Sequence, residues 1–218
     1  MSDAATRLDI VREQIVRAAK AARRKAGDVT LVAVTKQRGA NEIEPLIAAG
    51  VTDFGENRVQ EAAEKWPALR NAHPNVRLHM VGRLQSNKAD EAIALFDVIH
   101  SLDRRSLLDA LVKAGDKAGH YPDVFVQVNI GTEEQKGGVA IEDLPGFLGQ
   151  VRASPLPLAG LMAMPPLEKQ PGPYFALLAE LARRHDVTGL SMGMSSDYPT
   201  AVMLGATIIR VGSALFED

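Results

Sequence analysis

Segments typical of β-strands alternate with segments typical of α-helices along nearly the whole chain. The strand segments are short runs of aliphatic and β-branched residues, and the segments between them carry apolar residues at helical spacing. This alternation predicts βαβ units and a parallel sheet. We expect strands at 30–35, 52–55, 77–81, 98–101, 124–129, 158–162, 189–192 and 207–211, and helices at 41–49, 58–69, 87–96, 104–118, 141–153, 174–184 and 199–204.

Eight strands with right-handed crossovers favour an α/β fold closed into a single (β/α)8 TIM-type barrel. The 218 residues are few for that fold but within its range. The alternative is an open, doubly wound sheet, because short strands are easily miscounted. No Pro/Gly/Ser-rich linker divides the chain, so we expect one domain over 1–218. Apolar residues from Leu8 to Ala22 recur at helical spacing, which predicts an additional N-terminal helix, within 1–27, that packs on the barrel.

Charge and composition narrow the possible partners and location. Lys and Arg number 25 and Asp and Glu 27, a net charge of −2 that offers no electrostatic case for nucleic acid or an anionic membrane. The sequence has no cysteine, which excludes disulfides and thiol nucleophiles and fits a reducing compartment. There is no signal-peptide-like segment, and the acidic residues near the N-terminus argue against a mitochondrial presequence. We therefore expect a cytoplasmic monomer.

Lys36 ends the apolar run that begins at Val29, and this run is typical of a strand buried on both faces. An amine at the carboxyl end of such a strand lies where α/β folds place their chemistry. We expect it to be partly desolvated, which would lower its pKa and favour the neutral, nucleophilic form. The alternative is a surface lysine that begins a loop.

Small residues with hydroxyl groups follow the seventh and eighth predicted strands. The segment 191–197 contains Ser195, Ser196 and a glycine, and Gly212 and Ser213 follow the last strand. In TIM barrels these two loops commonly bind a phosphate through backbone N–H groups and hydroxyls. A serine that only caps the next helix is the simpler interpretation, and the two roles are compatible.

Arg210 lies at the carboxyl end of an apolar strand, where its guanidinium needs an acceptor. A phosphate, a ring nitrogen or a structural ion pair could each supply one. A Schiff-base lysine, a phosphate loop and an arginine that faces an aromatic nitrogen are together the contacts that hold pyridoxal phosphate (PLP).

The chain resembles, over nearly its whole length, the pyridoxal phosphate homeostasis proteins, which are similar to the barrel domain of alanine racemase standing alone. The matching segments are LVAVTK (31–36), FGENRVQE (54–61), HMVGRLQSNK (79–88), HSLDR (100–104), QVNI (127–130), GLM (160–162) and the stretch 190–216. Several such segments in one order are specific to the family. The tail departs from it, because residues 215–218 stop where relatives often continue with glycine and basic residues.

The resemblance implies PLP as the cofactor and assigns roles to six residues. It implies that Lys36 forms the Schiff base, that Asn57 lies beside the cofactor ring, and that Arg210 faces the pyridine nitrogen. It also implies that the phosphate is held by Ser195, Gly212 and Ser213. The resemblance assigns no catalytic residue. The five histidines show no metal-type spacing, so we expect no metal site.

The chemistry favours a carrier over an enzyme. Arginine only donates hydrogen bonds, so a ring nitrogen that faces it stays unprotonated and is a weak electron sink. Alanine racemase also uses a second domain, for which we see no room. We expect storage, delivery or scavenging of PLP, with apo-PLP enzymes as recipients. Two alternatives stay open: a slow amino-acid racemase, and an unrelated barrel enzyme that acts on a sugar phosphate through Lys36. Lys136 is a possible secondary amine for the aldehyde, and His79 and His100 are expected to be hydrogen-bonded core residues.

Overall fold

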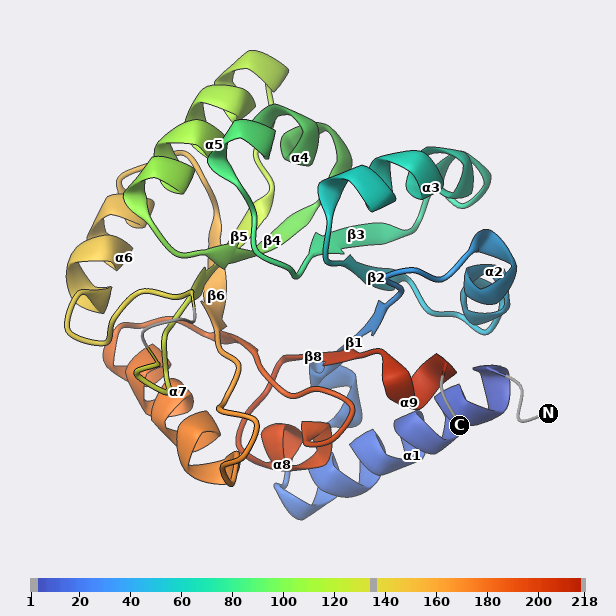
Figure 1. Cartoon of the computed structure of the whole chain (residues 1–218). Helices are drawn as coiled ribbons and strands as arrows, with labels where there is room; N and C mark the ends of the chain where they lie inside the picture. The colour runs from blue at the N-terminus through green and yellow to red at the C-terminus, as the bar shows by residue number, and fades with distance from the viewer. Residues whose placement is uncertain (1–3, 134–136, 217–218) are drawn as a thin grey trace.

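Eight parallel strands close into a barrel in the computed structural model, which describes residues 4–133 and 137–216 (Figure 1). Each strand pairs with its neighbours in chain order, and β8 returns to pair with β1, with Thr30 opposite Ile208 and Val32 opposite Arg210. The predicted TIM-type barrel is thus confirmed, and the open-sheet alternative is wrong. The strands are β1 (Thr30–Val34), β2 (Asp53–Glu56), β3 (Arg77–Met80), β4 (Val98–Leu102), β5 (Asp123–Gln127), β6 (Leu158–Met162), β7 (Gly189–Ser191) and β8 (Ile208–Val211).

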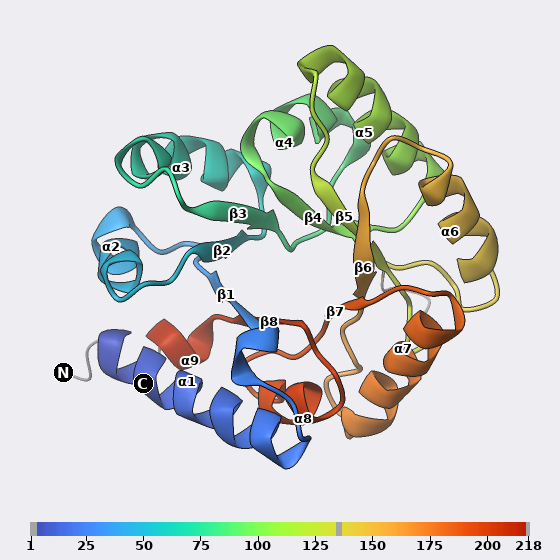
Figure 2. The same cartoon turned by 180° about the vertical axis from the view of Figure 1, so that it is seen from behind.

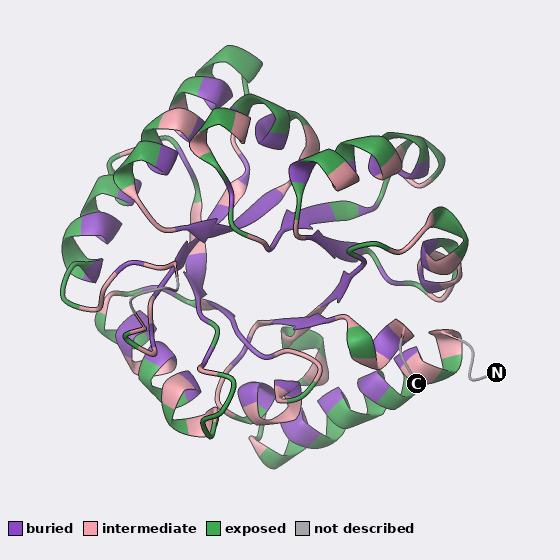
Figure 3. Ribbon diagram, viewed as in Figure 1, coloured by how far each residue is buried: buried purple, intermediate pink, exposed green. Residues whose placement is uncertain are grey.

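Helices surround the barrel and turn their buried faces toward it (Figure 3). Their bounds are α1 (Ala4–Ala21), α2 (Ala40–Ala48), α3 (Val59–Ala72), α4 (Ala89–Leu95), α5 (Arg105–Ala118), α6 (Leu144–Arg152), α7 (Gly172–Arg184), α8 (Tyr198–Met203) and α9 (Ser213–Phe216), with 3-10 turns η1 (Ala26–Asp28) and η2 (Ser86–Lys88). Among the described residues, none of these helices is long and apolar enough to cross a membrane.

Successive residues of each strand face opposite sides of the sheet, so one set packs against the helices and the other points into the barrel. Residues such as Phe54, Leu78 and Ile99 point outward and pack with the helices in the main core. The residues between them point into the barrel, where Val98, Phe125 and Met162 form a small apolar cluster. Gly160 and Gly189 lie beside the Phe125 ring, and a Cβ at either would come within 3.0 Å of it. The barrel interior therefore has room for a large ring only because these two positions lack side chains.

Helix α1 packs alongside α8 and α9, as both views of the fold show (Figures 1 and 2). Its buried face includes Leu8, Val11 and Ile15. Beyond its end, Arg24 donates hydrogen bonds to the carbonyls of Val202 and Ala206 at 2.7 and 2.9 Å. The N-terminal segment thus supports the side of the barrel from which the loops after β7 and β8 emerge.

Candidate functional site at the barrel mouth

The six residues that the sequence assigns to a cofactor all lie at the carboxyl-terminal end of the barrel. Lys36 follows β1, Asn57 follows β2, and Ser195 lies in the loop after β7. Arg210 lies within β8, and Gly212 and Ser213 come directly after that strand. A Cβ built on Gly212 would lie 3.4 Å from the carbonyl oxygen of Val34, two residues before the lysine. The phosphate-loop candidates and the candidate amine are therefore neighbours across the β1–β8 seam.

Lys36 is exposed, whereas the sequence suggested partial burial. The barrel wall ends at Thr35, which is fully buried, and the chain then turns at Lys36 with φ of 34°. A residue with a Cβ pays about 1–2 kcal/mol for this left-handed conformation, so something must hold it. The Lys65 ammonium does so by donating hydrogen bonds to the carbonyls of Lys36 at 2.7 Å and Arg38 at 3.1 Å.

A buried carboxylate fixes Lys65 in turn. Glu56 ends β2 with no exposed surface, and one of its oxygens lies 2.7 Å from the Lys65 nitrogen. The same oxygen accepts hydrogen bonds from the Trp66 indole at 2.8 Å and from the Thr35 hydroxyl. The Lys36 turn is thus braced by an ion pair between α3 and β2. We missed this role in the sequence, although an acidic residue at the end of a buried strand is the same kind of signal that singled out Lys36.

The loops after β7 and β8 meet at Ser195. Its hydroxyl oxygen accepts hydrogen bonds from the backbone N–H groups of Gly212 at 3.1 Å and Ala214 at 3.2 Å. The serine therefore joins the two loops that the sequence marked for phosphate, instead of capping α8, whose N-cap residue is Asp197. These two N–H groups are thus already paired with Ser195, whose hydroxyl keeps its own proton to donate, and hydroxyl and backbone N–H groups are the kind of donor that binds a phosphate.

Arg210 is buried and begins a chain of hydrogen bonds that crosses the barrel interior. Its Nη1 donates to the Ser191 hydroxyl, and its Nη2 donates to the Ala163 carbonyl at 3.2 Å. Ser191 Oγ lies 2.7 Å from His100 Nδ1, and His100 Nε2 lies 2.9 Å from His79 Nδ1. His79 Nε2 ends the chain 2.9 Å from a carboxylate oxygen of Asp53. We refer to Asp53, His79, His100, Ser191 and Arg210 as the barrel relay.

The two ends of the barrel relay fix which groups donate hydrogen bonds at those ends. Arg210 can only donate, and an ionised Asp53 can only accept. Ser191 Oγ therefore accepts a hydrogen bond from Arg210, and His79 Nε2 carries the proton that it donates to Asp53. Burial is the main cause that lowers the pKa of His100 well below 6.5, so this ring is neutral. Burial raises the pKa of Asp53, but hydrogen bonds from His79 and Thr52 outweigh it and leave the pKa below 3.8.

Arg210 is charged and can still donate hydrogen bonds beyond those of the barrel relay. Burial lowers its pKa to about 10, while the charge of Asp197 opposes that shift. The guanidinium is thus protonated at neutral pH. Two of its five N–H groups have acceptors in Ser191 and Ala163, so others can donate to a ligand at the mouth. His79 and His100 are hydrogen-bonded core histidines, as the sequence suggested, with His100 stacked on Phe125 at 4.7 Å between ring centroids.

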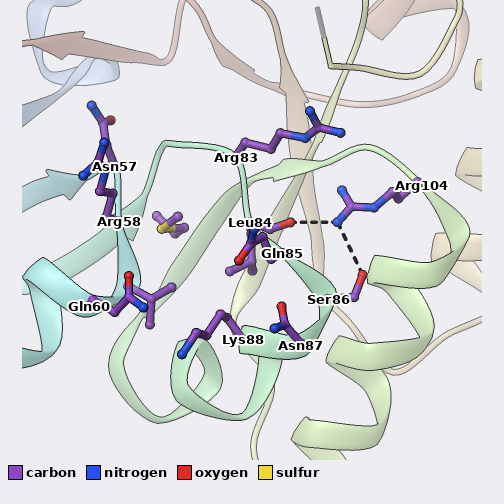
Figure 4. Close-up of a pocket in the computed structure, with 12 residues that line it drawn as sticks. Asn57, Arg58, Gln60, Arg83, Leu84, Gln85, Ser86, Asn87, Lys88 and Arg104 are labelled. Carbon is purple, nitrogen blue, oxygen red and sulfur yellow. Dashed lines mark hydrogen bonds between the residues drawn. The ribbon is translucent and has the colours of Figure 1, made fainter.

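A pocket of about 730 Å³ opens on the rim, and of the six predicted cofactor residues it is lined by Asn57 alone (Figure 4). It lies between the ends of β2, β3 and β4 and is lined by the cationic side chains of Arg58, Arg83, Lys88 and Arg104. We call it the basic rim pocket. The sequence reasoning missed it, because its four cations come from three segments.

Two further residues add little to the site. Tyr198 is buried and donates a hydrogen bond to Gln14 at 2.7 Å, which makes it a packing residue that ties α8 to α1. Lys136 lies outside the described residues. In the described part of the chain, no group of three or more His, Asp or Glu side chains could hold a metal ion.

Comparison with known proteins gives consistent matches. Residues 9–218 match the family described as alanine racemase, N-terminal domain. A pyridoxal phosphate homeostasis protein of Synechocystis sp. is 39% identical over 200 residues, which cover 87% of this chain and 91% of that protein. The structure of PipY from Synechococcus elongatus with PLP bound is similar, with a TM-score of 0.85 and 37% identity, over 98% of this chain and 100% of that one. Alanine racemase from Corynebacterium glutamicum shares the fold, with a TM-score of 0.65 at 20% identity over 96% of this chain and 61% of the racemase.

Proposed function

Because this chain belongs to the pyridoxal phosphate homeostasis protein family, within the alanine racemase N-terminal domain family, we propose that it binds PLP at the barrel mouth and stores, delivers or scavenges it in the cytoplasm. The observation that carries the proposal is that three features lie at one end of the barrel. They are the exposed Lys36 amine, the two loops joined at Ser195, which we call the two-loop anion site, and the buried, charged Arg210. A PLP-bound relative with the same fold supports it.

Each predicted residue has a task that fits its surroundings. PLP supplies an aldehyde with which an amine condenses, and we propose Lys36 as that amine, held as a Schiff base. The brace from Lys65 fixes the backbone from which the Lys36 side chain extends. The N–H groups near Gly212 and the hydroxyls of Ser195 and Ser213 would bind the phosphate, and the Asn57 amide would lie beside the ring.

Arg210 is the reason that we propose a carrier and not an enzyme. Ser191 accepts a hydrogen bond from Arg210, and the guanidinium is protonated at neutral pH, so Arg210 can only donate to a ring nitrogen. A nitrogen that accepts this hydrogen bond stays unprotonated, and the ring then stabilises a substrate carbanion poorly. Apo-PLP enzymes are the recipients that we propose for the bound cofactor.

A transfer experiment tests this function. The purified protein is loaded with PLP, desalted, and mixed with the apo form of a PLP-dependent transaminase. We expect the protein to stay yellow through desalting, to lose that absorbance to the transaminase, and to restore transaminase activity. In the absence of transaminase, incubation with L-alanine should give no steady formation of D-alanine. Failure to retain PLP would refute the binding site, and sustained racemisation would favour the enzyme alternative.

A further inference from the structure

The basic rim pocket carries positive charge without an acidic residue in its lining. Of its twelve lining residues, four are Arg or Lys, and the rest are amides, a serine and apolar residues. Three of the cations have carboxylate partners: Arg58 with Glu61 at 3.4 Å, Lys88 with Glu91 at 2.8 Å, and Arg104 with Asp103 at 2.6 Å; none of the three carboxylates lines the pocket. The charge that faces the cavity is therefore positive, although the whole chain has a net charge of −2.

Two arginines are placed differently around this cavity (Figure 4). Arg104 is held rigidly, because it also donates hydrogen bonds to the Leu84 carbonyl at 2.8 Å and the Ser86 hydroxyl at 3.3 Å. Arg83 is exposed, and within the described residues its side chain has neither a hydrogen bond nor an ion pair. A guanidinium with all its donors available beside a fixed one is suited to bind the oxygens of a phosphate or carboxylate.

The pocket is separate from the two-loop anion site at Ser195. That site belongs to β7 and β8, whereas the pocket lies over the ends of β2, β3 and β4, across the closed barrel. Its volume of about 730 Å³ is that of a small-molecule site. We propose that the basic rim pocket is a second binding site, for a small polyanion that carries two or more phosphate or carboxylate charges. The proposal does not depend on PLP binding.

Pyrophosphate is a suitable probe, and two-dimensional 1H–15N NMR of the full chain locates where it binds. We expect saturable shifts of the Arg83 Nε–H signal and of the backbone amides of residues 85–88, with affinity that falls as salt rises. Arg83→Gln should weaken binding at these signals at least tenfold. Because the Arg83 side chain has no hydrogen bond or ion pair within the described residues, this variant should melt at the wild-type temperature.

Arg105→Gln is the matched control. Arg105 adjoins Arg104 in sequence and loses the same charge, but it pairs with Asp109 on the exposed face of α5, outside the pocket. This variant should bind pyrophosphate as the wild type does. Shifts confined to the amides of Gly212 to Ala214 would place the anion only at the other site and overturn the proposal. Pyrophosphate binding that is weakened equally in both variants, or that does not saturate, would show only a general attraction to positive charge. Either result would also overturn the proposal.

Discussion

Replacing Ser191 with alanine should show how much the barrel relay contributes to the free energy of unfolding. The change removes one buried hydroxyl and leaves Arg210 Nη1 without its acceptor and His100 Nδ1 without its hydrogen-bond partner. Each buried polar group left without a partner costs about 1–3 kcal/mol, so the two together cost about 2–6 kcal/mol. Arg210 keeps its hydrogen bond to Ala163, which favours the lower half of that range. We expect a loss of about 3 kcal/mol in the free energy of unfolding.

Thermal unfolding and histidine NMR check this expectation. For a chain of this length, about 3 kcal/mol corresponds to a melting temperature lower by about 6–12 °C. Ser196→Ala, which changes an exposed serine of the next loop, is the control and should change the free energy by no more than about 0.5 kcal/mol. In the wild type at neutral pH, 15N spectra should show a neutral His100 imidazole. A protonated His100 imidazole, or a Ser191→Ala variant as stable as the control, would refute the relay.

Three further perturbations test other parts of the site. Lys65→Met should cost about 3–5 kcal/mol, because it leaves the buried Glu56 carboxylate without its cation, and adding Glu56→Gln should restore part of that loss in chemical denaturation. Stability should fall with acid in two windows. Below about pH 6.5 the unfolded state takes up a proton that buried His100 resists, and below about pH 4 Asp53, whose folded pKa is lowered, loses its stabilising charge. Asp53→Asn should flatten only the lower window in denaturation curves recorded from pH 7 to 3, and an unchanged profile would contradict the Asp53 assignment. Arg210→Glu should favour protonation of the ring nitrogen, shift the absorbance of bound PLP and speed α-proton exchange of amino acids; an unchanged spectrum would mean that Arg210 does not face the ring.

The fold could be predicted from the sequence because a buried strand of a parallel sheet can be recognised from its own few residues. Each strand that the structure contains overlaps a predicted one, since both faces of a barrel strand are covered and most of the strands are rich in apolar residues. The ends differ by one or two residues, as at Glu56, which extends β2, and at Leu102, which extends β4. Helix α9 was missed because four residues, Ser213–Phe216, show no periodicity.

The sequence could predict single residues of the site but not the contacts between them. Lys36 and Arg210 could be recognised in the sequence because a charged residue at the end of an apolar strand is unusual. Their partners are not, because Ser191 is 91 residues from His100 and their contact depends on the register of the barrel. The left-handed turn at Lys36 likewise has no local signal such as glycine, since Lys65, 29 residues away, stabilises it.

The most direct test of the central claim is borohydride reduction of the PLP-loaded protein, followed by intact-mass and peptide mass spectrometry. Reduction makes a Schiff base permanent, so the modified lysine can be located. We predict one added reduced-PLP mass, confined to the peptide that contains Lys36, and no addition in a folded Lys36→Ala variant. The same addition in Lys36→Ala, or its location on another lysine such as Lys136, would contradict the account.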